Sequence, residues 1–322
     1  MRKRVLLPSV FLLHTLFATA VADSAESSPP PEYAMNTVPL KSGYTFKVNA
    51  LWVNLNTSVW DPRKRTSVDN LTREDFVLSE DGVPQTVSDC IASESSFHLL
   101  MLLDVSASTT SFIDLLRQAV LRFSDQLKPT DRVAIMTFST RAVMVQSFTS
   151  DRAKIRQAVR SIRPDGATAF YDALSLALRT VGEIPGRKAI VVFSDGVDNR
   201  MVAPGDGSWT SFPELQQKIR EQDALVYTIF LTSERDRGDH LVERASQEMQ
   251  MIAADSGARM YRPEKPSELS AAYAEVVNDL RHIYTLKYTP ADTQAHGWRR
   301  LAVQVKGREG LLVRSRAGYY LD

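Results

Sequence analysis

The chain has 322 residues, a formal net charge of +1 at pH 7, and 24% charged and 43% hydrophobic residues. This balance excludes a generally basic nucleic-acid-binding protein and a strongly acidic solvating protein, and it is ordinary for a folded chain with a sizeable core. The one cysteine, Cys90, excludes an intramolecular disulfide and a cysteine-based zinc finger. The five histidines are scattered without the spacing of metal ligands, which argues against a zinc hydrolase.

The first 22 residues have the pattern of a secretory signal peptide. Three basic residues at positions 2–4 precede a mostly apolar segment, and Ala20 and Ala22 fit the small-residue positions before a cleavage site. An uncleaved membrane anchor is the alternative, but Pro8 and His14 interrupt the apolar segment, which favours cleavage after Ala22. We therefore expect a secreted or periplasmic protein. Cleavage removes three positive charges and no acidic residue, so the net charge falls from +1 to −2.

A short linker and a β-rich segment follow the predicted signal. Residues 23–37 are rich in proline and serine, which is typical of a flexible linker that buries nothing. Residues 38–96 are predicted to form an N-terminal β module, because polar and apolar residues alternate over 46–54 and Glu80-Asp81-Gly82 is a turn signal.

Residues 97–283 alternate between strand and helix patterns. Four apolar runs have the length of strands buried on both faces, at 97–103, 133–138, 189–193 and 224–231. Apolar residues at helical spacing predict helices over 112–127, 155–162, 170–181, 240–254 and 267–282, with a further helix that begins after Ser211, where Ser211 and Glu214 have capping-box spacing. Residues 142–145 follow the second strand too closely for a helical crossover, so we predict a hairpin there, and a short sixth strand is predicted over 259–261. The pattern predicts a doubly wound α/β fold on a mostly parallel, six-stranded, Rossmann-like sheet.

The chain ends in a second β-rich segment, residues 284–322. We predict strands over 284–288, 301–305 and 311–320, with the last two as a hairpin around the turn at 307–310. Because β segments lie on both sides of the α/β domain, we expect them to pack together as one small antiparallel module into which the α/β domain is inserted.

Oxygen-bearing side chains follow three of the predicted α/β elements. Asp104, Ser106 and Ser108 come directly after the first buried strand, Thr168 precedes the helix at 170, and Asp195 follows the strand at 189–193. Ligands of open α/β sheets bind at the carboxyl ends of the strands, so these side chains are expected to converge. Two carboxylates and three hydroxyls suit a hard cation such as Mg²⁺, but they leave a coordination position for water or an outside ligand.

These residues resemble the metal-ion-dependent adhesion site of von Willebrand factor type A domains. Asp104, Ser106 and Ser108 stand in a D-x-S-x-S motif, with Thr168 in the second loop and Asp195 in the third. The resemblance covers residues 97–283 and implies a sheet with one antiparallel edge strand and a Mg²⁺ or Mn²⁺ ion held by these five residues. Two positions depart from the family pattern, since Ala107 replaces a usual glycine and Thr109 a common methionine; neither is a ligand.

The flanking segments resemble a narrower bacterial branch, the secreted VWFA-related domain proteins. The resemblance rests on residues 71–77 and Glu80-Asp81-Gly82-Val83-Pro84-Gln85 before the domain, and on residues 284–290 and Arg316-Ala317-Gly318-Tyr319 after it. It implies an architecture of the whole mature chain, without a specific activity.

Each predicted ligand also has a simpler interpretation. Serine and threonine cap helices and turns, and Asp195-Gly196 alone is typical of a turn. Arg200 and Trp209, in the Gly- and Pro-rich loop predicted at 198–210, could line the rim of a partner site or lie in a mobile loop.

We interpret the chain as a non-catalytic adhesion or protein-binding protein. Its metal ion would accept a Glu or Asp carboxylate from a protein partner. Two alternatives stay open: a metal-stabilised structural scaffold of the cell envelope, and a metal-assisted hydrolase or phosphoryl-transfer enzyme. The sequence has no G-x-S-x-G elbow, P-loop or H-E-x-x-H motif, which favours binding over catalysis.

Overall fold

The structure, a computed structural model, describes residues 52–64, 66–92, 96–202, 207–232, 238–263, 266–293 and 296–321. These residues belong to one compact unit, residues 50–322. The predicted signal peptide (1–22), the predicted linker (23–37) and the start of the N-terminal β segment (38–51) lie outside the described residues. Of the helices that the structure describes, none combines the length and the apolar character needed to span a bilayer.

The α/β region is built on a six-stranded sheet with the strand order β11-β10-β9-β6-β7-β8. Its strands are β6 (His98–Asp104), β7 (Arg132–Phe138), β8 (Ala142–Thr149), β9 (Lys188–Ser194), β10 (Leu225–Phe230) and β11 (Met260–Tyr261). Neighbouring strands are parallel, except that β7 and β8 form the predicted antiparallel hairpin at one edge. The predicted fold class, a mostly parallel, doubly wound α/β sheet, is confirmed.

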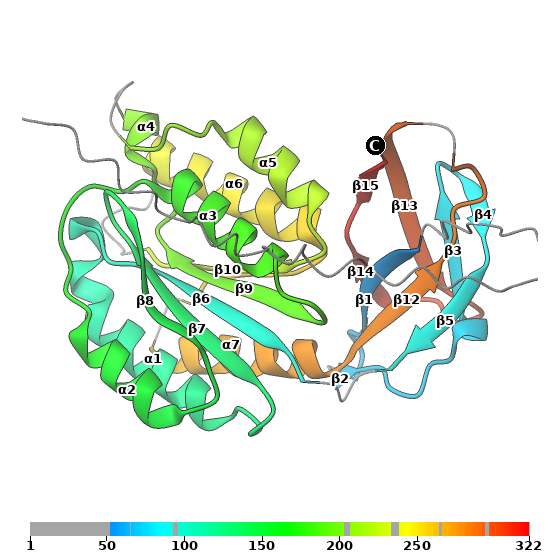
Figure 1. Ribbon diagram of the computed structural model, residues 1–322, viewed down its shortest axis with the longest axis horizontal. Coiled ribbons are helices and arrows are strands. Elements are labelled where there is room, and N and C mark those ends of the chain that lie inside the picture. The colour runs from blue at the N-terminus through cyan, green and yellow to red at the C-terminus, as the bar shows by residue number, and fades with distance from the viewer. Residues whose placement is uncertain are drawn as a thin grey trace, which may run out of the picture. The chain divides into compact units, whose positions relative to one another are not determined.

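Helices cover both faces of this sheet (Figure 1). One face is covered by α1 (Ile113–Asp125), α2 (Arg152–Ser161) and α7 (Pro266–Arg281), and the other by α3 (Phe170–Gly182), α5 (Phe212–Glu221) and α6 (His240–Ser256). Along β6, Leu99, Met101 and Leu103 pack in the first layer, whereas Leu100 and Leu102 pack in the second. A strand sandwiched in this way has no polar face, which is why its sequence is a continuous apolar run.

The terminal β segments interleave in two antiparallel sheets. One sheet has the order β14-β1-β12-β5, with β2 paired to β1, and the other has the order β15-β13-β3-β4. The strands are β1 (Val53–Asp61), β2 (Thr66–Ser67), β3 (Phe76–Glu80), β4 (Val83–Gln85), β5 (Val87–Ile91), β12 (Ile283–Tyr288), β13 (Gly297–Val305), β14 (Leu312–Ser315) and β15 (Gly318–Leu321). Since β1 pairs with β12 and β14, and β3 pairs with β13, both sheets combine N- and C-terminal strands, as predicted.

In β1, Val53, Leu55 and Val59 point into the core, whereas Trp52 just before the strand is 56% exposed. The last predicted strand differs from the sequence expectation. The strand expected over 311–320 is divided: β14 pairs with β1 in one sheet, and β15 pairs with β13 in the other. At the start of β15, Gly318 packs so closely on the Arg299 carbonyl that a Cβ there would lie 2.2 Å from the oxygen. The turn at 307–310 indicates that the chain reverses direction. It does not indicate that the following segment contributes β14 to one sheet and β15 to the other.

Arg187 links the two ends of the inserted α/β region. It is only 8% exposed, and its main-chain oxygen accepts a hydrogen bond of 2.9 Å from the N–H of His98, the first residue of β6. Its guanidinium donates to the main-chain oxygen of Ile283, the first residue of β12, at 3.1 Å. Burial lowers the pKa of Arg187 to about 10, so the side chain is still a cation at neutral pH. One buried residue therefore contacts both points where the chain passes between the α/β region and the β strands.

Candidate metal-ion site

The first site loop follows β6 directly. Asp104 ends this strand and is only 1% exposed, and its Oδ1 accepts a hydrogen bond of 2.9 Å from the N–H of Ser106. The hydroxyl oxygens of Ser106 and Ser108 lie 3.0 Å apart. Ser106 is buried and Ser108 is exposed, so this pair of hydroxyls leads from the strand end toward the surface. The structure thus brings together the three predicted residues of this loop.

Thr109 fixes the conformation of the same loop. Its buried hydroxyl is within hydrogen-bond distance of two main-chain oxygens, those of Asp104 at 3.1 Å and of Ser106 at 2.9 Å. The loop continues as a 3₁₀ helix, Ala107–Phe112, which is not among the elements predicted from the sequence. A methionine at position 109 could not donate these bonds. This departure from the family pattern therefore stabilises the loop from within.

The second site loop ends β9, the neighbour of β6. Ser194 donates from Oγ to Asp104 Oδ2 at 2.5 Å and accepts from the N–H of Gly196 at 2.8 Å. Asp195 is half-buried, and its Oδ1 accepts from the N–H of Val197 at 3.1 Å. Each oxygen of Asp104 therefore has one hydrogen bond and keeps lone-pair capacity for a further ligand.

Asp104 and Asp195 interact electrostatically across the two strand ends. Burial of Asp104, followed by the negative charge of Asp195, raises the pKa of Asp104 to about 7, although hydrogen bonds from Ser106 and Ser194 act in the opposite direction. Two carboxylates that oppose each other's ionisation favour either a proton or a cation at the site. The structure therefore brings together the two acids of the predicted set.

Thr168 comes from the loop before α3 and is buried. Its N–H donates to Asn199 Oδ1 at 2.9 Å, and its carbonyl accepts from the N–H of Asn199 at 2.9 Å. The same loop reaches the first one, where the N–H of Ala107 donates to the Gly166 carbonyl at 3.1 Å. Thr168 is thus joined to the other loops through the main chain of its own loop, and the three predicted loops adjoin one another.

Asp198 and Asn199 support this arrangement and were not predicted as site residues. Asp198 is fully buried and accepts bonds from the N–H groups of Tyr171, Arg200 and Ser208 and from the Ser208 hydroxyl. The loop predicted at 198–210 contains a single helical turn, α4 (Asn199–Val202). Asp198 directly precedes this turn, and an aspartate in that position is a capping signal that could have indicated it.

Arg200 and Trp209 occupy different positions in the loop. Arg200 donates from Nη1 to the main-chain oxygens of Ser208 at 3.0 Å and Trp209 at 2.9 Å, so its guanidinium bonds within the loop. Trp209 is 85% exposed, while its N–H donates to Asp172 Oδ2 at 2.8 Å. The indole is therefore presented to solvent by a main chain that is held on both sides.

The donor set fits a small divalent cation. Asp104, Ser106, Ser108, Thr168 and Asp195 offer oxygen alone, and the two acids would balance the charge of one Mg²⁺ or Mn²⁺ ion. In the described ranges, no group of three or more His, Cys, Asp and Glu side chains is placed to hold a metal ion, and this site itself has only two acids beside its hydroxyls.

Part of the α/β region is similar to a known protein domain. Residues 99–197 match the sequence profile of the von Willebrand factor type A domain. A UPF0353 protein from Mycobacterium leprae (strain Br4923) is 25% identical over 207 residues, which are 59% of this chain and 58% of that protein. The chain thus spans little more than half the length of this relative.

Two solved structures share low sequence identity with the chain. An aerotolerance-related membrane protein from Bacteroides fragilis is 18% identical with a TM-score of 0.45, over 57% of this chain and 98% of that one. Proximal thread matrix protein 1 from the mussel byssus was solved with zinc in its metal-ion-dependent adhesion site (MIDAS) motif. It is 18% identical with a TM-score of 0.47, over 62% of this chain and 49% of that one. From the match over 99–197, which includes Asp104, Thr168 and Asp195, we conclude that the chain contains a von Willebrand factor type A domain.

Proposed function

We propose that this protein is an exported, non-catalytic binding protein that holds Mg²⁺ or Mn²⁺ and, through the ion, a carboxylate of a protein partner. The ligands are Asp104, Ser106, Ser108, Thr168 and Asp195. The observation that carries the proposal is the pair Asp104 and Asp195: burial, and after it the negative charge of Asp195, raises the pKa of Asp104. A cation between them removes this repulsion, and five side-chain donors leave an octahedral ion one position for an outside ligand.

Metal binding is tested by calorimetric titration of the full chain with Mg²⁺ and with Mn²⁺. The wild-type chain is expected to bind one ion, and Asp104→Ala to bind none while it keeps its circular dichroism spectrum. Asp125→Ala serves as the matched control, because its carboxylate lies on the surface of α1 with only a 4.0 Å ion pair to Arg156. Asp104→Ala with wild-type metal affinity would refute the site.

Partner binding is tested by capture from an envelope extract in Mg²⁺ and in EDTA. A specific partner should be retained by the wild-type chain in Mg²⁺ and lost in EDTA and with Asp104→Ala. Capture by Asp104→Ala equal to that of the wild type would end the adhesion hypothesis, even if the metal binds.

The contacts between the loops favour binding over a purely structural role for the metal. The first loop is already tied to the Thr168 loop by Ala107 and Gly166, and to β9 by Ser194 and Asp104. Thr168 is tied to Asn199 in the same way. Loops joined by their own hydrogen bonds do not need an ion to hold them together, so we expect the Asp104→Ala domain to stay folded. The scaffold alternative predicts instead that this variant unfolds.

A further inference from the structure

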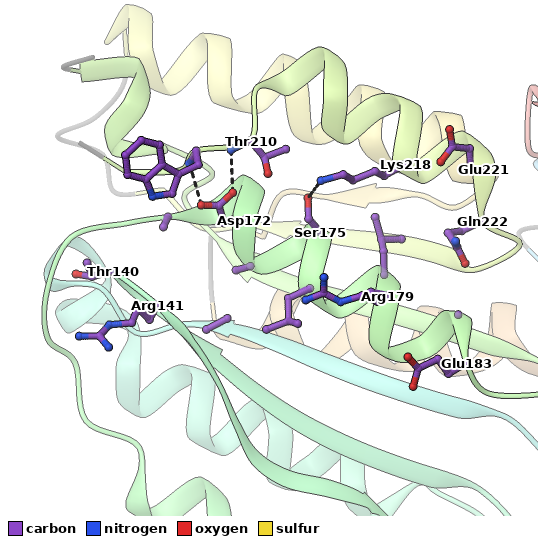
Figure 2. A pocket seen from close by; sticks show the side chains of 17 residues that line it. Thr140, Arg141, Asp172, Ser175, Arg179, Glu183, Thr210, Lys218, Glu221 and Gln222 are labelled. Carbon is purple, nitrogen blue, oxygen red and sulfur yellow. Dashed lines mark hydrogen bonds between the residues drawn. The ribbon is translucent and has the colours of Figure 1, made fainter. Parts of the chain in front are cut away.

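A groove of about 850 Å³ runs between α3 and α5, next to the proposed metal site (Figure 2). Thr140 and Ala169 line one of its ends. Thr140 Oγ1 accepts a hydrogen bond of 3.1 Å from the N–H of Ala167, and Ala169 directly follows Thr168. This end of the groove is therefore continuous with the loop that carries a proposed metal ligand.

The charged side chains of the groove are segregated along its length. Figure 2 shows Arg141 beside Thr140, then Arg179 and Lys218 in the middle, and Glu183 and Glu221 at the far end. All five side chains are exposed. Among the described side chains, no carboxylate lies within ion-pair distance of Arg141 or Arg179, so these cations are available to a ligand.

The acid at the metal end is already engaged. Asp172 accepts hydrogen bonds on both carboxylate oxygens, from the N–H groups of Trp209 at 2.8 Å and Thr210 at 2.9 Å. It therefore fixes the loop that presents the Trp209 indole, which is 85% exposed beside the groove. Ala173 and Leu176 of α3 form an apolar floor between the charges. An exposed aromatic side chain on a fixed main chain, next to arginine and an apolar surface, is typical of a binding anchor.

We propose that this groove binds an extended segment of the protein partner, the segment that flanks the carboxylate bound to the metal. Charge complementarity fixes its chemistry: the segment is acidic next to the metal site, where it meets Arg141, Arg179 and Lys218, and basic at the end that meets Glu183 and Glu221. The 13 residues of α3 span about 20 Å at a rise of ~1.5 Å per residue, which corresponds to about six residues of extended chain. The inference rests on the proposed function, since the metal sets where the segment begins.

The test uses labelled eight-residue peptides of one composition and the full chain in Mg²⁺. In two peptides the glutamates and lysines form separate blocks, in the two possible orders, and in the third they alternate. Fluorescence anisotropy should show that one of the block peptides binds at least about tenfold more tightly than the alternating peptide. Equal affinity of all three peptides would overturn the inference.

Charge reversal tests the groove itself. Arg141→Glu with Arg179→Glu should weaken the preferred peptide about tenfold and leave Mg²⁺ affinity unchanged. The matched control, Lys154→Glu with Arg160→Glu, reverses two exposed cations of α2, which packs on the opposite face of the sheet, and should bind the peptide like the wild type. Glu183→Lys with Glu221→Lys should instead improve the binding of an all-glutamate peptide.

The outcomes separate the two proposals. Unchanged peptide affinity in the Arg141→Glu, Arg179→Glu variant, with normal Mg²⁺ binding, would refute the groove and leave the metal site intact. Block preference that persists in EDTA and in Asp104→Ala would refute the metal-linked function, while the groove would stand.

Discussion

At the scale of single residues, Asp104 makes the stability of the metal-free protein depend on pH. Its pKa is raised to about 7 in the folded chain from an ordinary value of 3.8. The folded state therefore binds an extra proton between these values, and the free energy of unfolding falls as the pH rises through this window. A shift of this size corresponds to roughly 4 kcal/mol at most.

We expect the chain in EDTA to lose stability as the pH rises from about 4 to about 7, and to regain most of it at pH 8 when saturated with Mg²⁺. Urea unfolding at several pH values measures both effects. Asp104→Asn should flatten the pH dependence in EDTA, because the amide has no proton to lose in this range. A chelated wild-type chain that is equally stable at pH 5 and pH 8 would show that burial and the charge of Asp195 do not raise the pKa of Asp104.

Some residues of the candidate site are recognisable from the sequence, and others are not. Asp104 and Asp195 stand out in the sequence because acidic side chains at the ends of apolar strands are unusual, and Thr168 stands out by its place just before a helix. Ser194 does not stand out, because the last residue of a doubly buried strand is expected to be a core residue, and its bond to Asp104 depends on how two strand ends are aligned. Asn199 was likewise missed because its role is to hold the main chain of Thr168.

At the scale of elements, the close approach of α6 to the segment between β14 and β15 depends on Gly257. This residue ends α6 with φ 83°, and a Cβ there would lie 2.6 Å from the main-chain carbon of Ser315. Gly257→Ala should therefore lower the free energy of unfolding by about 1 kcal/mol for the left-handed conformation, and by up to about 3 kcal/mol in all for the overlap.

Gly186 provides the control for this prediction. It has the same φ of +83°, but a Cβ there would meet nothing within 4 Å. Gly186→Ala should show the conformational cost alone, so the difference between the two variants in urea unfolding reports the close packing. Equal losses would mean that the main chain around Ser315 moves aside.

The elements themselves were largely predictable, with physical reasons for the exceptions. Buried strands such as β6 and β9 stand out because both of their faces are apolar, and α5 is announced by the Ser211–Glu214 capping box, which the structure forms. The 3₁₀ turn at Ala107–Phe112 and the helical turn α4 have no periodic pattern, since they are held by loop contacts. The division between β14 and β15 depends on which sheet edge is available to each strand, and the local sequence does not predict this.

At the scale of the whole molecule, the β strands of the N-terminal segment depend mainly on partners from the C-terminal segment. The described pairings inside the N-terminal segment, β1 with β2 and β3 with β4, are only two and three residue pairs long. Val53 of β1 is paired with Tyr288 of β12, and Phe76 of β3 with Val305 of β13. We therefore predict that residues 38–96 expressed alone are unfolded and quickly digested by trypsin. Residues 97–283 expressed alone should keep a helix-rich circular dichroism spectrum, because both helix layers pack on a sheet made within this range. A protease-resistant 38–96 fragment would contradict the interleaved module.

Arg187 has a consequence for the order in which the chain folds. Strands separated by more than 190 residues, such as β5 and β12, face a large loop-closure entropy and pair slowly when the intervening chain is unfolded. Once the α/β sheet has formed, Arg187 holds the residues at both of its exits, His98 and Ile283, so that the flanking strands start from neighbouring points. We therefore expect the α/β region to fold first and to act as a template, so that the β strands from the two ends of the chain pair afterwards as a nearly local event.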